Sequence, residues 1–311
     1  MSLSMTRATK RRRTPLSCLG TRRVAQALSS EYGRRVDISP INNDAFKAEL
    51  ADATMKFLVP TPAGHAGFML MSGEASPSLV SRAVHNIRIA RDSVSARTGA
   101  LILPPVATGT VEGRTFAVWP MKRSFLASTR VMQRLNGLSY AKTISRWVAS
   151  LCHETLVPAT AETVLGDLNV IVEDSAFSNE IRRAAEHAAG RVCAGQWQPM
   201  HCLHHGDLWS GNLLLPTHWD VPSFYVIDWA GMQRQGYPFL DLARMLMSLR
   251  CDSQFNAGCI TNLRAHIGCD KDAVVGYILS ACGRIGANLE HFPPDRFRTA
   301  TRDLYEFVKT A

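Results

Sequence analysis

Apolar residues between positions 54 and 121 fall into short runs separated by polar turns. Four of these runs are rich in apolar or β-branched residues, as is typical of strands: 54–60, 67–72, 78–84 and 114–120. Between the third and the fourth run, residues 85–98 place Ile87, Ala90 and Val94 on one face of a helix. The pattern therefore predicts a small lobe of strands with one helix.

From about residue 125 onward, apolar positions recur every three or four residues. Helical periodicity covers 127–154, 178–195, 238–250, 272–285 and a final stretch that reaches Val308. Strand character returns only at 212–215 and 224–227, and we expect these two pieces to pair. The chain is therefore predicted to have an α+β fold, with a small strand-rich lobe over 41–121 and a larger helical lobe over 122–311.

The charge of the chain is unevenly distributed. The net charge of the 311 residues is +9, but residues 1–40 hold nine Lys and Arg against two acids, so the remainder is nearly neutral. We interpret residues 1–40 as a basic, flexible tail that could touch an anionic surface, and expect no nucleic-acid binding by the folded body. Scattered cysteines, no signal peptide and no apolar run of about 18 residues favour a reduced, cytoplasmic protein.

The segment HHGDLWSGNLLL, residues 204–215, carries the residues with the clearest chemistry. Asp207 and Asn212 lie in a loop before one short strand, and Asp228 follows the other. Pairing of the strands would bring Asn212 and Asp228 to neighbouring ends of one hairpin. Carboxylate and amide oxygens are ligands for Mg²⁺, and Asp207 would then accept a proton from an attacking hydroxyl. This order of base, ligand and ligand predicts phosphoryl transfer.

HGDLWSGN followed by VIDW resembles the catalytic core of the aminoglycoside phosphotransferase and choline kinase superfamily, small-molecule kinases with a protein-kinase-like, two-lobed fold. Residues 238–243, PFLDLA, resemble the start of a helix in that superfamily. The resemblance implies a structural role for Asp241, which would brace the catalytic loop, and for His205. It also implies ATP or GTP and Mg²⁺ as cofactors, and the hydroxyl of a small molecule as acceptor.

The resemblance also implies residues for the nucleotide side of the site. A basic residue on the third strand of the small lobe would contact the phosphates, and Arg82 in the run 78–84 is the candidate. Its acidic partner from the following helix would be Asp92. Gly64 and Gly67 would lie in the loop over the phosphates, and Trp119 and Met121 would lie in the hinge that binds the purine.

Two other functions remain open from the sequence. A protein kinase is disfavoured because glycine replaces the arginine of HRD and no APE segment is present. A pseudokinase that acts as a binding module would fit the irregular small lobe. The acceptor also remains open, because six acids without a Lys or Arg in residues 154–180 could face a cation, whereas seven acids balance seven bases in residues 251–311.

Overall fold

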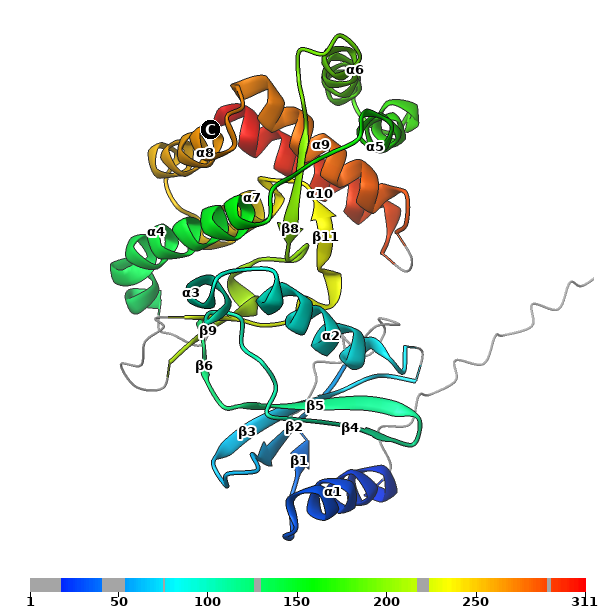
Figure 1. Ribbon diagram of the computed structural model, residues 1–311, viewed down its shortest axis with the longest axis vertical. Coiled ribbons are helices and arrows are strands. Elements are labelled where there is room, and N and C mark those ends of the chain that lie inside the picture. The colour runs from blue at the N-terminus through cyan, green and yellow to red at the C-terminus, as the bar shows by residue number, and fades with distance from the viewer. Residues whose placement is uncertain (1–17, 41–53, 75, 126–129, 217–223, 290–291) are drawn as a thin grey trace, which may run out of the picture.

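The computed structural model describes residues 18–40, 54–74, 76–125, 130–216, 224–289 and 292–311. Figure 1 shows a sheet with helices α1 and α2 on its two sides, and beyond α2 a larger assembly of helices. The α+β, two-lobed architecture predicted from the apolar pattern is confirmed. Within the described residues, no helix combines the length and apolarity needed to cross a bilayer.

The small lobe is built on a five-stranded antiparallel sheet in the order β1-β2-β3-β5-β4. Its strands are β1 (Ser39–Pro40), β2 (Met55–Pro60), β3 (Ala66–Met71), β4 (Ala107–Val111) and β5 (Arg114–Pro120). The strands predicted at 54–60, 67–72 and 114–120 are therefore confirmed. Alternate residues of β2, β3 and β5 are buried on the outer face, because side chains along a strand alternate between the two faces.

Helix α1 (Cys18–Tyr32) covers the outer face of the sheet. Val24 and Leu28 are fully buried against it, one helical turn apart. The guanidinium of Arg34 donates to the carbonyl of Thr61 at 2.8 Å. The prediction of a flexible tail is therefore wrong for residues 18–40, because an apolar pair and a basic side chain attach them to the lobe. Residues 1–17 of the predicted tail lie outside the described residues.

The prediction of a third strand at 78–84 is also wrong. Residues Leu79–Asp92 form helix α2, followed by the short α3 (Ala96–Gly99). The buried residues follow helical spacing, with Val80, Ala83, Ile87 and Ala90 on one face. The amide of Val80 in the first turn donates to the Ser72 hydroxyl at 2.9 Å, which satisfies one of the free N–H groups at a helix start.

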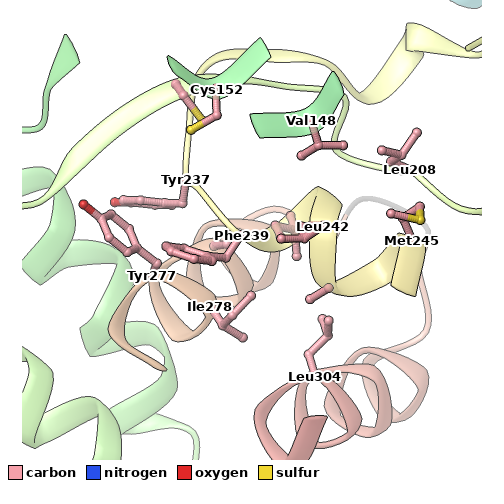
Figure 2. Close-up of a cluster of buried hydrophobic side chains, with 14 of the residues drawn as sticks. Val148, Cys152, Leu208, Tyr237, Phe239, Leu242, Met245, Tyr277, Ile278 and Leu304 are labelled. Atoms are coloured by element: carbon pink, nitrogen blue, oxygen red, sulfur yellow. The ribbon is translucent and has the colours of Figure 1, made fainter. Parts of the chain in front are cut away.

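Seven helices make up most of the described large lobe: α4 (Arg130–Glu154), α5 (Ala161–Glu173), α6 (Asn179–Cys193), α7 (Leu240–Leu249), α8 (Ser253–Ile267), α9 (Lys271–Gly286) and α10 (Pro294–Thr310). The predicted helices correspond to α4, α6, α7, α9 and α10, whereas α5 and α8 were not predicted. Figure 2 shows the core around α7, where Phe239 lies beside Tyr277 and Ile278 of α9, and Met245 lies beside Leu208. This packing fixes the position of α7 next to the loop between β8 and β9.

Two three-stranded sheets lie between the helices and the small lobe. One contains β6 (Arg123–Ser124), β9 (Leu213–Leu215) and β10 (Tyr225–Val226), in the order β10-β9-β6. The other contains β7 (Val157–Pro158), β8 (Met200–His204) and β11 (Gln233–Gly236), in the order β11-β8-β7. Val226 pairs with Leu213 and Tyr225 with Leu214, so the predicted hairpin is confirmed.

Candidate active site

Asp241, in the first turn of α7, fixes the backbone of the loop between β8 and β9. The two carboxylate oxygens of Asp241 accept the amides of His205 at 2.5 Å and Gly206 at 3.0 Å. His205 Nε2 lies 2.8 Å from the carbonyl of Ile227. Gly206 has φ +81°, and a Cβ there would lie 2.3 Å from the carbonyl oxygen of Gly231, so the position requires glycine. These contacts fix the direction of the next residue, Asp207.

The Asp207 side chain lies on the wall of the cleft and is engaged on both carboxylate oxygens. Arg244 of α7 forms an ion pair with Oδ1, and the Asn212 amide nitrogen donates to Oδ2 at 3.3 Å and to the Asp207 carbonyl at 2.8 Å. Burial raises the pKa of Asp207, the charge of Arg244 opposes that rise, and the nearby carboxylate of Asp228 adds to it. Two carboxylates within electrostatic reach of each other make this wall attractive to a cation.

Asp228 lies at the end of β10, in the left-handed conformation with φ 67° and ψ 60°. Ile227 donates its amide to the carbonyl of Asn212 at 3.1 Å, so the predicted meeting of Asn212 and Asp228 at one end of the hairpin is observed. Asp228 is exposed, and its side chain makes no hydrogen bond or ion pair within the described residues. A non-glycine residue held at positive φ beside a cleft is typical of functional sites.

The cleft between the lobes has a volume of about 840 Å³. Phe68 and Leu70 of β3 and Trp119 of β5 line it from the sheet, and the rings of Phe68 and Trp119 stack at 5.6 Å. Asp207 and Asp228 line it from the large lobe. An apolar, aromatic wall therefore faces two carboxylates across one cavity, which is the arrangement of a ligand site with a few convergent polar groups.

The predicted pair of Arg82 and Asp92 is not formed. Both residues lie on α2, and ten residues of helix separate them by about 15 Å. Arg82 lines the cleft from this helix and not from a strand, whereas Asp92, in the last turn of α2, does not line it. No acid of α2 therefore pairs with Arg82, and the phosphate contact predicted for it would be made by an arginine without that partner.

Three further candidates on the nucleotide side lie away from the described wall of the cleft. Gly64 lies in the turn between β2 and β3, with φ +86°, next to the Arg34 guanidinium. Gly67 has a packing role, because a Cβ there would lie 2.7 Å from the carbonyl oxygen of Trp119. The Met121 amide already donates to the carbonyl of Ala66 at 2.9 Å. Of the predicted hinge residues, only Trp119 lines the cleft.

Two residues at the site were not recognised in the sequence. Arg244 follows Asp241 by three residues, and this helical spacing could have indicated that both reach the same loop. Asn86 of α2 donates its side-chain amide to the carbonyl of Trp229 at 2.8 Å. Trp229 begins the short 3₁₀ helix η3 (Trp229–Gly231), so Asn86 attaches the small lobe to the segment that follows Asp228. No local pattern marks a contact between residues so far apart in the chain.

No protein-family model matches the chain, and no curated protein matches it. Several solved structures do match the chain. A macrolide 2'-phosphotransferase type I is 14% identical with a TM-score of 0.58, over 94% of this chain and 98% of that one. The choline kinase LicA from Streptococcus pneumoniae is 11% identical with a TM-score of 0.54, over 93% and 99%. An aminoglycoside 2'-phosphotransferase-IIIa bound to GDP is 12% identical with a TM-score of 0.53, over 93% and 98%.

Each of these similarities extends over nearly the full length of both chains, and the identities are low. The shared property is therefore the arrangement of helices and strands. All three structures are small-molecule kinases or phosphotransferases, in agreement with the resemblance of residues 204–243. This chain has the fold of the aminoglycoside phosphotransferase and choline kinase superfamily.

Proposed function

We propose that the protein transfers the γ-phosphate of ATP or GTP to a hydroxyl group of a small molecule. The observation that carries this proposal is the position of Asp207, Asn212 and Asp228 at one cleft, in the order and on the elements that phosphoryl transfer requires. Asp207 and Asp228 line the cavity, and Asn212 contacts Asp207 directly. The likeness to kinases that act on small molecules supports the same function.

We propose that the purine of the nucleotide binds to the wall of the cleft that the sheet forms. Phe68 and Trp119 offer a flat aromatic surface, and Leu70 extends it along β3. Arg82 reaches the same cavity from α2 and supplies a positive charge for the phosphates. Lys56 of β2 pairs across from Leu70 and so lies on the same face of the sheet, which makes it a second candidate for contact with the phosphates.

The residues at the end of the β9–β10 hairpin fit a magnesium ion. The Asn212 amide nitrogen is used by Asp207, which leaves its oxygen as a ligand, and the Asp228 carboxylate makes no hydrogen bond within the described residues. Among those residues no three His, Cys, Asp or Glu side chains cluster as a metal cage. Mg²⁺ bound by one or two protein groups and by substrate phosphates would neutralise charge on the transferred group.

Within this arrangement Asp207 and the residues that contact its loop have separate roles. Asp207 accepts the proton of the acceptor hydroxyl as the oxygen attacks phosphorus. Arg244 and Asn212 hold the carboxylate of Asp207 from its two sides, and Asp241 holds the backbone of the loop. The protein therefore contributes mainly position and charge, as is expected for phosphoryl transfer.

Nucleotide binding provides the first test. We expect calorimetry to show Mg²⁺-dependent binding of ATP or GTP to the wild type, and its loss in Asp228→Asn, because the change removes the charge of a metal ligand and keeps its size. Asp252→Asn is a matched control, since Asp252 caps the start of α8 and does not line the cleft. Mg²⁺-dependent binding that is equal in the wild type and in Asp228→Asn would contradict the metal assignment. A wild type that binds no nucleotide would favour a pseudokinase.

A further inference from the structure

The turn between α9 and α10 gives the cleft an apolar wall that the phosphoryl-transfer residues do not use. Four apolar residues from the end of α9 to the start of α10 line the cavity that contains Asp207: Ile285, Leu289, Phe292 and Pro293. Phe292 is 46% exposed, although large apolar side chains are usually buried in a folded protein. Exposed apolar residues that gather in a cavity are typical of a ligand site.

Backbone and packing contacts fix the position of this apolar wall. The amide of Phe292 donates to the carbonyl of Leu289 at 2.7 Å, so one turn of the chain carries both side chains. Gly286 is the last residue of α9, and a Cβ there would lie 2.7 Å from the ring of Phe297, which is buried on α10. The end of α9 is therefore packed closely against α10, and the wall has a fixed support.

The apolar wall lies on the same side of the cleft as Asp207. Arg284, in the last turn of α9, donates to the carbonyl of Gln235 in β11, so α9 ends beside that strand (Figure 1). β11 pairs with β8, and β8 leads directly into the loop that carries Asp207. The aromatic wall proposed for the purine comes from β3 and β5. A molecule on the apolar wall would therefore approach the proposed base from the large lobe.

The charged residues of this part of the cleft already have roles. Arg244 pairs with Asp207. Arg284 has an acidic partner at 2.8 Å, and Arg296 also has an interaction. Asp228 lines the cavity as a carboxylate without a partner among the described residues, and the proposed function assigns it to the metal. What the described wall offers to an acceptor is therefore mainly apolar surface.

We propose that the acceptor is an uncharged alcohol whose hydroxyl is attached to an apolar body, and that this body binds on Ile285, Leu289 and Phe292. This inference rests on the proposed function, and it names the acceptor class for that site. Contact between an apolar body and exposed apolar side chains removes both surfaces from water, which favours binding. A cationic body would lose hydration on the same wall without gaining a partner there, so the wall discriminates against it.

The test uses four glucosides that share one neutral sugar and differ in the group attached to it. They are the methyl, butyl, hexyl and aminohexyl β-D-glucosides, titrated by calorimetry into the full chain, with and without Mg²⁺ and a non-hydrolysable ATP analogue. We expect hexyl glucoside to bind about 10- to 100-fold more tightly than methyl glucoside, because burial contributes about fourfold per methylene and about two or three methylenes reach the wall. Butyl glucoside should lie between the two. The charged aminohexyl chain should bind more weakly than the hexyl chain.

Variants then locate the apolar subsite. Phe292→Ala should remove most of the preference for the hexyl chain and leave the affinity for methyl glucoside nearly unchanged, and Leu289→Ala is a second variant of the same wall. Leu138→Ala is the matched control, because Leu138 is 51% exposed on α4 and does not line the cleft. The inference is overturned if hexyl glucoside binds no more tightly than methyl glucoside, if aminohexyl glucoside binds most tightly, or if the preference for hexyl survives in both variants of the wall.

Its failure is distinguishable from failure of the proposed function. Phosphorylation of a polar or cationic acceptor with Mg-ATP, without a preference for the longer alkyl chain, would retain the kinase and reject the apolar subsite. A preference for the hexyl chain that depends on Phe292, in a protein that never transfers phosphate to any hydroxyl, would retain the subsite and reject the kinase.

Discussion

Asp207 is the residue on which the proposed chemistry depends, and the structure surrounds it with groups that fix its direction. Arg244 contacts one carboxylate oxygen and Asn212 the other. Each carboxylate oxygen has two lone pairs, so both contacts leave Asp207 able to accept a proton. Because Asp241 and Arg244 are one turn apart on α7, one helix positions both the backbone of the loop and its carboxylate.

Replacing Arg244 tests its role in positioning Asp207. At saturating acceptor, Arg244→Gln should lower kcat by about 10- to 100-fold, because a hydrogen bond to a charged group contributes about 1.5–3 kcal/mol. The dissociation constant for Mg-nucleotide should change little, since Arg244 contacts the proposed base, Asp207, and neither of the two proposed metal ligands. Arg244→Lys should restore part of kcat, because it keeps the charge and loses the fork. Equal kcat in the wild type and Arg244→Gln would show that Asp207 does not need this contact.

Helix α1 shows how elements outside the cleft support it. Its apolar face packs on the outer face of the sheet whose inner face carries Phe68, Leu70 and Trp119. Leu28→Ala should destabilise the protein by about 2–5 kcal/mol, the usual cost of emptying a buried leucine site. Chemical denaturation measures this change, with Gln26→Ala as the control on the exposed face of the same helix. If Leu28→Ala resembles the control, α1 is not part of the folded lobe.

The elements that could be predicted from the sequence are those with one clear period. β2, β3 and β5 carry alternating apolar residues, and α4, α7 and α9 carry long helical repeats. The prediction for residues 78–84 failed because a run of seven residues is too short for its apolar positions to distinguish a strand from a helix turn. The helix forms because Ser72 caps its first turn, and buried positions continue to Ala90. Tertiary packing decided between the two periods.

The positions of Asp207, Asn212 and Asp228 could be predicted from the sequence, whereas the opposite wall of the cleft could not, for a physical reason. Asp207, Asn212 and Asp228 lie within 22 residues around one hairpin, so local spacing determines their positions. The other wall combines Phe68, Trp119 and α2, which are distant in sequence and meet through sheet pairing and the contact of Asn86 with Trp229. No local periodicity in the sequence indicates such contacts. The expected Arg82–Asp92 pair is absent because both residues lie on one helix and not on a strand and the helix that follows it.

At the scale of the whole molecule, the cleft has walls of different character. The sheet contributes aromatic and aliphatic side chains, the β8–β9 loop and the segment after β10 contribute carboxylates, and α7, α9 and α10 contribute arginines. Asn86 joins the small lobe to the segment after Asp228, so any relative movement of the lobes would act on the proposed metal site. We therefore propose that nucleotide, metal and acceptor bind within one continuous cavity.

Transfer of the γ-phosphate tests this account most directly. Phosphorus NMR of the full chain with Mg-ATP and a panel of hydroxylated acids, neutral sugars and amino alcohols should show ATP converted to ADP and a new phosphomonoester signal. Asp207→Asn should lower the rate by about 10²- to 10⁴-fold, the range for loss of a general base, while Mg-ATP binding persists. Wild-type protein that binds Mg-ATP and forms no phosphomonoester, or Asp207→Asn protein that forms it at the wild-type rate, would contradict the account.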